Sequence, residues 1–424
     1  MSGIRKSLLQ FVFSGASMSR WNDKLRPVEL VEIDKQGHKM IVAWLLYELN
    51  SRHLTSEERL DLGQKIVEGG LFDYLYRLVI TDIKPPVFYR IRENEEDYQK
   101  LTTWVLAKLE HIVRPLDEGF WQRLTQYFDT KRSQNLADRI LSAAHSYASG
   151  WEFNVLKNLN TFDPEMKEIE ESFKVRLGEF MDIVGVQDLM HDQDVLDANS
   201  ITVKASALGA FASFCGQLRF QKRWSQTPRI PESSVLGHMF IVASYGYFFS
   251  LQLGAKQARC NNNFFCGLFH DLPELLTRDI ISPVKQSVAG LPDLIRAYED
   301  QELERRIFAP LRGAGQEALV ARLCYFLGME IGSEFKECII KEGKVCEATL
   351  DDLQADFGAD CYDPKDGRML KVCDILAAFM EAHTSIRNGI APPELWEAMA
   401  RFRNAYRGEV LGNIHMGALF ADFD

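Results

Sequence analysis

The sequence lacks several features that would define its class at once. Its longest apolar run, residues 239–254, is interrupted by Ser, Tyr and Gln and is too short to span a bilayer. The eight cysteines all lie in the second half and form no Cys-x-x-Cys pair, which excludes a zinc ribbon and a thioredoxin-type site. We therefore expect a protein that neither crosses a membrane nor depends on clustered thiols.

Positive charge is also scarce. There are 49 Lys and Arg residues against 60 Asp and Glu residues, a formal net charge of -11. Because duplex nucleic acid rewards a dense Lys/Arg face, polymeric nucleic acid is not expected as a ligand. The first fifteen residues contain a short apolar run without a convincing signal-peptide cleavage site, which predicts a cytoplasmic protein. No GxxxxGK[ST] phosphate loop occurs.

The residues that are present indicate a large helical protein. The chain has 424 residues, of which 46% are hydrophobic and 26% charged, enough to bury an extensive core in two domains. Apolar side chains recur every three or four residues in segments such as Val235, Met239, Val242, Tyr245 and Phe249, whereas long strict alternation is rare. This spacing predicts an all-α fold.

An internal repeat organises the chain. Residues 267–284 align with residues 70–87 without a gap, and nine of the eighteen positions are identical. Upstream, GHMFIVA at Gly237 matches GHKMIVA at Gly37, and an Arg-Trp pair precedes both segments. We therefore predict two tandem helical domains, residues 1–155 and 156–424. The second copy is longer, which we assign to an insertion around residues 333–363, expected to form an irregular excursion or a short hairpin.

The strongest chemical signal lies in the second copy. His270 and Asp271 precede Pro273, a residue that suits the first turn of a new helix, so the pair is expected at a helix junction. His238 from an earlier helix and Asp374 from a later one would complete a set of two nitrogen and two oxygen ligands. Such a mixed set suits one Mn²⁺, Co²⁺, Fe²⁺ or Zn²⁺ ion, and Mg²⁺ is a further candidate.

These motifs resemble an HD-superfamily metal-dependent phosphohydrolase, most of all the bacterial 5′-deoxynucleotidase (YfbR-like) branch. The resemblance covers residues 218–379 through LRFQKRW, SSVLGHM, HDLPELLTRDIISPVK and KVCDILAAF, in that order. It implies that a single divalent ion is held by four ligands: His238, His270, Asp271 and Asp374.

The resemblance also implies roles for the neighbouring residues. Glu274 and Asp279 would orient and deprotonate a metal-activated water, Arg223 would bind the phosphate, and Trp224 would shape the nucleoside end of the pocket. One position departs from the family pattern: Gly237 stands where an acidic residue usually precedes the first ligand His.

The first copy is degenerate. Aligned by identity, it retains some of the motif residues, namely Arg20, Trp21, His38, Asp82 and Asp138. Asp73 and Tyr74, however, stand opposite His270 and Asp271, and Arg77 stands opposite Glu274. Because Arg77 would oppose a bound cation, we interpret this half as a catalytically inactive pseudo-domain. We expect it to pack against the second copy as an intramolecular pseudo-dimer, and further homo-oligomers remain compatible with the sequence.

The predicted activity is the hydrolysis of phosphate monoesters, most plausibly (deoxy)nucleoside 5′-monophosphates, with a small-molecule nucleotide as the substrate. Two alternatives stay open. One is a hydrolase of deoxynucleoside triphosphates or signalling nucleotides, since the same metal set supports both reactions. The other is a non-catalytic sensor of nucleotides or metal, against which the carboxylates of Glu274 and Asp279 argue, because a purely structural metal site needs neither.

Overall fold

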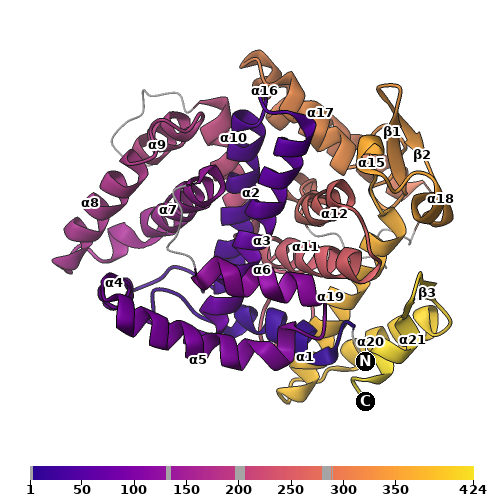
Figure 1. The fold of residues 1–424 in the computed structure, drawn as a ribbon, viewed down its shortest axis with the longest axis horizontal. Helices are drawn as coiled ribbons and strands as arrows, with labels where there is room; N and C mark the ends of the chain where they lie inside the picture. Colours follow the sequence, from indigo (N-terminus) through magenta and orange to yellow (C-terminus); the bar gives the residue numbers. More distant parts are fainter. Residues whose placement is uncertain (1–2, 130–134, 196–205, 279–287, 289) are drawn as a thin grey trace.

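The computed structural model describes residues 3–129, 135–195, 206–278, 288 and 290–424. The described chain is mostly helical, as expected, and differs from a strictly all-α fold by two short antiparallel hairpins (Figure 1). None of its helices is both long and apolar enough to cross a membrane.

The first half of the chain contains these elements in order, η marking short 3-10 or π turns: α1 (Lys6–Phe13), η1 (Ser14–Ser17), α2 (Glu32–Asn50), α3 (Ser56–Ile80), α4 (Pro85–Glu93), α5 (Glu95–Val113), α6 (Glu118–Asp129), α7 (Leu136–Leu156), η2 (Lys157–Leu159), α8 (Glu165–Gly178) and α9 (Val186–Val195). The predicted domain boundary at residues 155 and 156 falls at the end of α7, and the division itself stays a prediction.

The second half begins with α10 (Ala207–Gly216), η3 (Gln217–Phe220), α11 (Val235–Gln252), α12 (Gln257–Phe269) and α13 (Glu274–Thr277). It continues with α15 (Leu291–Leu303), η4 (Glu304–Phe308), α16 (Ala309–Gly313), α17 (Glu317–Phe326), β1 (Cys338–Lys341), β2 (Lys344–Glu347), α18 (Leu350–Ala355) and η5 (Asp360–Tyr362). The last elements are α19 (Gly367–Arg387), α20 (Pro393–Tyr406), β3 (Val410–Leu411), β4 (Ile414–His415) and α21 (Met416–Ala421).

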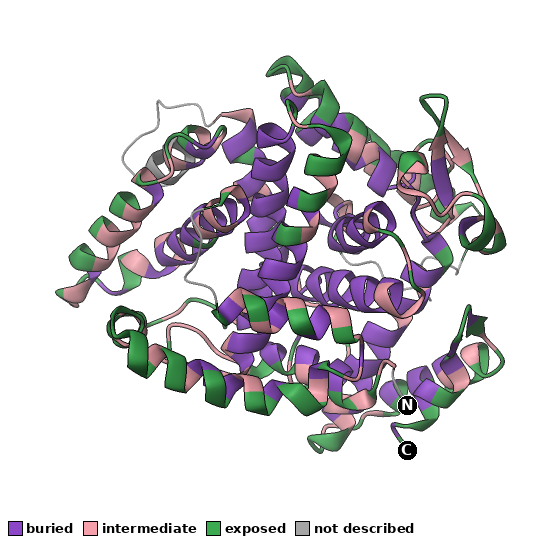
Figure 2. Cartoon of the chain, viewed as in Figure 1, coloured by how far each residue is buried: buried purple, intermediate pink, exposed green. Residues whose placement is uncertain are grey.

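Two long helices, α2 and α11, pack against each other and are buried along most of their length (Figure 2). Glycines permit the close approach. A Cβ atom on Gly37 would lie 2.9 Å from the carbonyl oxygen of Leu236, and one on Gly237 would lie 2.5 Å from Ile33. A side chain at either glycine would force the helices apart. One continuous apolar core therefore spans both halves of the chain.

The stretch predicted as an insertion, around residues 333–363, contains a short hairpin, one of the two forms expected for it. β1 and β2 pair antiparallel, with Cys338 opposite Glu347 and Lys341 opposite Lys344. Cys338 also forms an isolated bridge to Lys365, just before α19. This bridge ties the insertion to the start of the helix that carries Asp374.

Candidate metal centre

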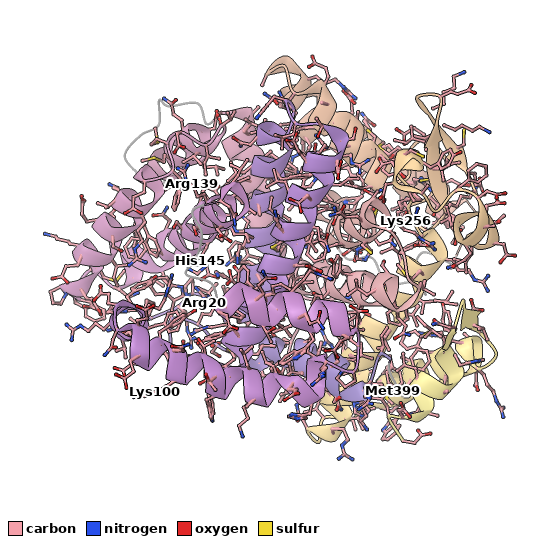
Figure 3. All side chains as sticks on the ribbon, viewed as in Figure 1. Arg20, Lys100, Arg139, His145, Lys256 and Met399 are labelled. Carbon is pink, nitrogen blue, oxygen red and sulfur yellow. The ribbon has the colours of Figure 1, made fainter. Side chains whose placement is uncertain are left out.

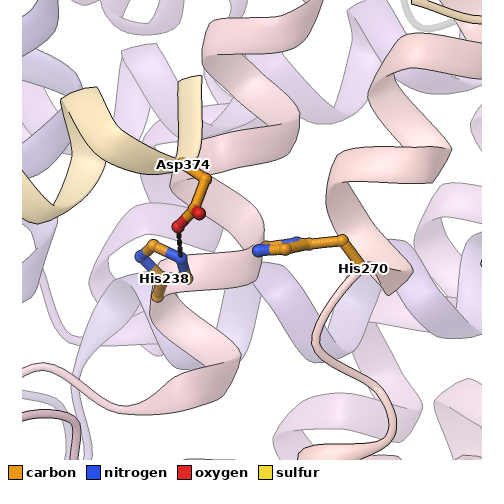
Figure 4. A group of neighbouring side chains, drawn as sticks. All are labelled: His238, His270 and Asp374. Atoms are coloured by element: carbon orange, nitrogen blue, oxygen red, sulfur yellow. Dashed lines mark hydrogen bonds and ion pairs between the residues drawn. The ribbon is translucent and has the colours of Figure 1, made fainter. Parts of the chain in front are cut away.

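Three helices bring three ligand-type side chains together. His238 is the fourth residue of α11, His270 directly follows α12, and Asp374 lies in the second turn of α19. One atom of each side chain lies within 4.8 Å of the other two, and the ring of His270 points toward the hydrogen-bonded pair of His238 and Asp374 (Figure 4). The structure thus joins residues that are 136 positions apart in the chain.

The predicted helix junction is present. α12 ends at Phe269, a short turn carries His270 and Asp271, and α13 starts at Glu274 after Pro273. Because proline lacks an amide hydrogen, it is tolerated where a new helix begins. The turn places two successive side chains at the same corner.

Asp271 lies at the edge of the cluster. Its Oδ2 atom is 3.3 Å from Nε2 of His270, 3.7 Å from Nε2 of His238 and 3.4 Å from Nη1 of Arg223. The carboxylate therefore faces both imidazoles and the guanidinium at once. All four predicted metal ligands are neighbours in the structure.

The histidine environments suit a cation. Nδ1 of His270 lies 2.8 Å from the carbonyl oxygen of Gly267, which only accepts, so Nδ1 carries a proton and, when the ring is neutral, Nε2 offers a lone pair to the cluster. That Nε2 atom is buried and makes no hydrogen bond with the described residues. Nδ1 of His238 is equally buried, without a hydrogen bond among the described residues, and lies 3.9 Å from Oε1 of Glu381. If Nε2 of His238 binds a cation, its Nδ1 proton faces this carboxylate, an orientation typical of metal-binding histidines.

The carboxylates are already ionised. Burial acts to raise the pKa of Asp374, but the Lys371 ammonium and His238 outweigh it and hold that pKa well below its usual value. Burial likewise opposes ionisation of Asp271, whereas His270, His238 and Arg223 together hold its pKa far below normal. A divalent cation could therefore bind both side chains without first displacing a proton from either.

Arg223 and Trp224 approach the cluster from the loop before α11. Arg223 lies within 3.4 Å of both Asp271 Oδ2 and Oε1 of Glu381. The indole nitrogen of Trp224 donates a 2.7 Å hydrogen bond to Oε2 of Glu381, and Trp224 has a positive φ of 55°, uncommon for a residue with a side chain. The predicted phosphate-binding arginine is thus positioned beside a predicted metal ligand.

Glu381 holds this arrangement together, and sequence reasoning missed it. The side chain is 1% exposed and accepts hydrogen bonds from Trp224 and from the hydroxyl of Ser233. Burial acts to raise the pKa of Glu381, but Arg223 and its other cationic neighbours lower it to about 2. The available signal was its spacing: Glu381 follows Asp374 by seven residues, two turns along the same helix face.

Lys371 is a second residue that the sequence did not single out. Its ammonium donates a 2.8 Å hydrogen bond to Oδ2 of Asp374, three residues later on α19, and lies 4.4 Å from the ring centre of Phe335. The Phe335 ring also approaches His270, with centroids 6.1 Å apart. A cation and an aromatic ring therefore border the cluster on its insertion side.

The remaining predicted site residues are placed less fully. Glu274 is buried one turn after His270, as the first residue of α13. Asp279 lies outside the described residues. At Gly237, an added Cβ atom would lie 2.6 Å from a carboxylate oxygen of Asp34 on α2. The departure from the family pattern at this position therefore coincides with the contact between the two halves.

Residues 215–403 match the family model of the HD domain. The match covers the whole cluster, including Arg223 and Glu381. Neither the curated proteins nor the solved structures compared with the chain gave a match. The C-terminal half of the chain thus carries an HD domain, and the domain contains a His/His/Asp cluster able to hold a metal ion.

Proposed function

We propose that the HD domain hydrolyses phosphate monoesters, with (deoxy)nucleoside 5′-monophosphates as the substrate class. The cluster of His238, His270 and Asp374 inside an HD domain carries this proposal. When bound there, a divalent ion supplies Lewis-acid polarisation of a phosphoryl oxygen and lowers the pKa of water. Asp271, beside both histidines, would complete the ligand set.

Arg223 would neutralise charge on the phosphoryl oxygens as it develops. Its guanidinium is held by Glu381 on one side and faces Asp271 on the other, so it is oriented before substrate arrives. Because these ion pairs already orient the guanidinium, it needs little reorganisation when a phosphate replaces water beside it. Lys371 would add a second positive charge at the same edge.

Glu274 would accept the proton of the attacking water. It is buried one turn beyond His270, on the short helix that follows the ligand corner. A buried carboxylate next to the reacting centre is suited to general-base chemistry. Trp224, anchored through its indole nitrogen, would border the nucleoside end of the pocket.

The deciding experiment measures phosphate release from a panel of nucleoside monophosphates with Mn²⁺, Co²⁺ or Mg²⁺ added. Asp374→Asn should lower kcat/KM at least about 100-fold, because a ligand and its charge are lost. Asp138→Asn is the matched control: identity alignment pairs the two aspartates, but Asp138 lies in the first turn of α7, where its amide is capped by Asn135. This variant should remain within about twofold of the native enzyme.

Two results would favour one of the alternative functions over this proposal. Release of pyrophosphate or triphosphate from nucleoside triphosphates, with monophosphates untouched, would indicate a triphosphate or signalling-nucleotide hydrolase. Stoichiometric metal binding without turnover of any nucleotide would indicate a sensor.

We further propose that the two halves are an inactive and an active copy of one HD-type unit, paired within the chain. Trp21 and Trp224 share a positive φ, and Thr81 and Arg278 do so at the ends of α3 and α13. Each tryptophan donates its indole N–H to a buried glutamate, Glu152 in the first half and Glu381 in the second. Both adjacent arginines pair with the same glutamates.

These contacts support a register that differs from the identity alignment. Isolated bridges join Ser19 to Val31 and Lys222 to Ser234, and the second residue of each pair directly precedes α2 or α11. Counted from these helix starts, the counterpart of His238 is Lys35, the fourth residue of α2, and not His38. Counted back from the two glutamates, the counterpart of Asp374 is His145, and not Asp138.

A further inference from the structure

The loop that carries Arg223 and Trp224 joins η3 to α11, and residues outside the HD match hold both of its ends. The first anchor is Arg219 in η3, whose side chain is 1% exposed. Its Nη1 atom donates a 2.8 Å hydrogen bond to Oε1 of Glu152, a fully buried residue near the end of α7. Arg20, labelled in Figure 3, contacts the other oxygen of Glu152. The loop therefore begins at a buried ion pair with the first half of the chain.

The rest of the Arg219 guanidinium also faces the first half. Its Nη2 atom lies 3.1 Å from Nδ1 of His38, and its central carbon lies 4.7 Å from the centre of the Trp151 ring. Burial and the charge of Arg219 lower the pKa of His38 to about 3, so the imidazole is neutral. Nε2 of His38 then donates to the carbonyl oxygen of Ala212 at 2.8 Å, and Nδ1 accepts from Arg219.

The second anchor lies at the other end of the loop. Ser234 is the N-cap of α11, where its hydroxyl oxygen accepts a hydrogen bond from the amide of Gly237. The same hydroxyl donates a 2.6 Å hydrogen bond to Oδ1 of Asp34 on α2, a residue that is 1% exposed. A Cβ atom on Gly237 would lie 2.6 Å from this oxygen, so the missing side chain leaves room for the contact. A buried carboxylate of the first half therefore fixes the residue at which the loop ends.

Backbone hydrogen bonds connect both anchors to Arg223. The amide of Arg223 donates to the carbonyl oxygen of Ser233 at 3.0 Å, and the amide of Val235 donates to the carbonyl oxygen of Gln221 at 2.9 Å. The two ends of the loop are thus paired with each other as well as with the first half. A displacement of either end would move the Arg223 guanidinium relative to Asp271, which it faces at 3.4 Å.

We propose that Asp34 and Glu152 are positioning residues, which act through Ser234 and Arg219 to hold the Arg223 loop in the orientation that binds a phosphoryl group. The first half would thereby support the reaction of the HD domain without supplying a catalytic residue. The part that concerns phosphate rests on the proposed function, whereas the ordering of the loop does not.

The first test follows amide hydrogen exchange in the full chain and needs no substrate. Asp34→Ala removes the acceptor of the Ser234 hydroxyl, so the protected amides of residues 221–235 should exchange about tenfold faster. Asp34→Asn keeps an acceptor oxygen and should stay within about twofold of the native protein. Tyr247→Phe is the matched control, because it removes a 2.8 Å hydrogen bond between the halves, to Glu68, thirteen residues beyond the loop on α11. It should leave the loop amides within about twofold.

The other anchor is tested by Arg219→Met. Glu152 keeps its ion pair with Arg20 and its hydrogen bond from Trp21, so this variant is expected to fold. The loop amides should again exchange about tenfold faster than in the native protein.

Phosphate release tests whether the anchor acts through Arg223. Asp34→Ala should lower kcat/KM about tenfold in the native background, but less than about twofold in the Arg223→Gln background, because the loop position no longer matters once the guanidinium is gone. Asp34→Asn should restore kcat/KM to within about twofold of the native value. A contact with a purely structural role would lower kcat/KM by the same factor in both backgrounds.

Native exchange rates of the loop amides in both Asp34→Ala and Arg219→Met would overturn the proposal. Equal losses of kcat/KM in the two backgrounds would overturn the positioning role. If the native protein hydrolyses no nucleotide, the proposed function fails, and faster exchange of the loop in Asp34→Ala would still support its anchoring by the first half.

Discussion

Replacing Glu381 with Gln tests whether this buried carboxylate sets the position of Arg223. The substitution keeps the size of the side chain, but the Gln amide has one acceptor oxygen, so only one of the hydrogen bonds from Trp224 and Ser233 can survive, and the charge that faces Arg223 at 3.4 Å is removed. Removing one partner of a buried ion pair costs about 2–4 kcal/mol when some hydrogen bonds survive. We expect the free energy of unfolding to fall by that amount.

Activity should fall as well, for a separate reason. If Arg223 stabilises the transition state only when correctly oriented, a less well oriented guanidinium should raise the activation free energy by about 1.4–2.7 kcal/mol. This corresponds to roughly a 10- to 100-fold decrease in kcat/KM. Metal stoichiometry should stay at one, because Glu381 does not contact the proposed ion position directly. Phosphate release and metal titration on the same preparation would separate the two effects.

Glu68→Gln is the matched control. Glu68 is also buried, pairs with Arg123 through both oxygens at 2.7 and 2.8 Å, and accepts a 2.8 Å hydrogen bond from Tyr247. It lies on α3, away from the cluster, so its loss should lower stability without lowering kcat/KM. Native activity in Glu381→Gln, or an equal loss of activity in Glu68→Gln, would refute the positioning role.

Three further predictions concern metal and charge. Mn²⁺ at about 100 times its Kd should raise the free energy of unfolding of the native protein by about 2.7 kcal/mol in denaturant titrations. The Asp374→Asn variant should lose most of this gain, and an undiminished gain would contradict the assignment of Asp374 as a ligand. Lys371→Met should tighten metal binding about tenfold, since the ammonium opposes a cation beside Asp374, while kcat/KM falls; unchanged metal affinity in a titration would count against this. Burial lowers the pKa of Lys35 in the folded protein from its usual 10.5 to about 7. Between these two pH values the unfolded chain binds a proton that the folded protein does not. The free energy of unfolding should therefore rise with pH across this range, by up to about 1.4 kcal/mol per pH unit. Lys35→Met should lack this rise, and parallel pH profiles of the two proteins would disprove it.

Much of the site was readable from the sequence. His270 and Asp271 could be placed at a helix junction because Pro273 marks the start of a helix, and the structure confirms the junction. The four candidate ligands could be recognised because the order and spacing of their motifs are specific. In the structure these side chains are neighbours. A short hairpin was one of two forms expected for the insertion, the other being an irregular excursion, and the structure shows the hairpin.

The sequence by itself predicted the helical class, the candidate metal ligands and, as a hypothesis, two related halves. If the two halves are copies of one unit, as proposed, the sequence did not determine which residues of the first half occupy the equivalent positions. Because a helix presents the same face every three or four residues, a shift from His38 to Lys35, or from Asp138 to His145, leaves the apolar pattern almost unchanged. Only the tertiary contacts of the Arg-Trp loops and their buried glutamates separate these registers, since they anchor each helix at one residue.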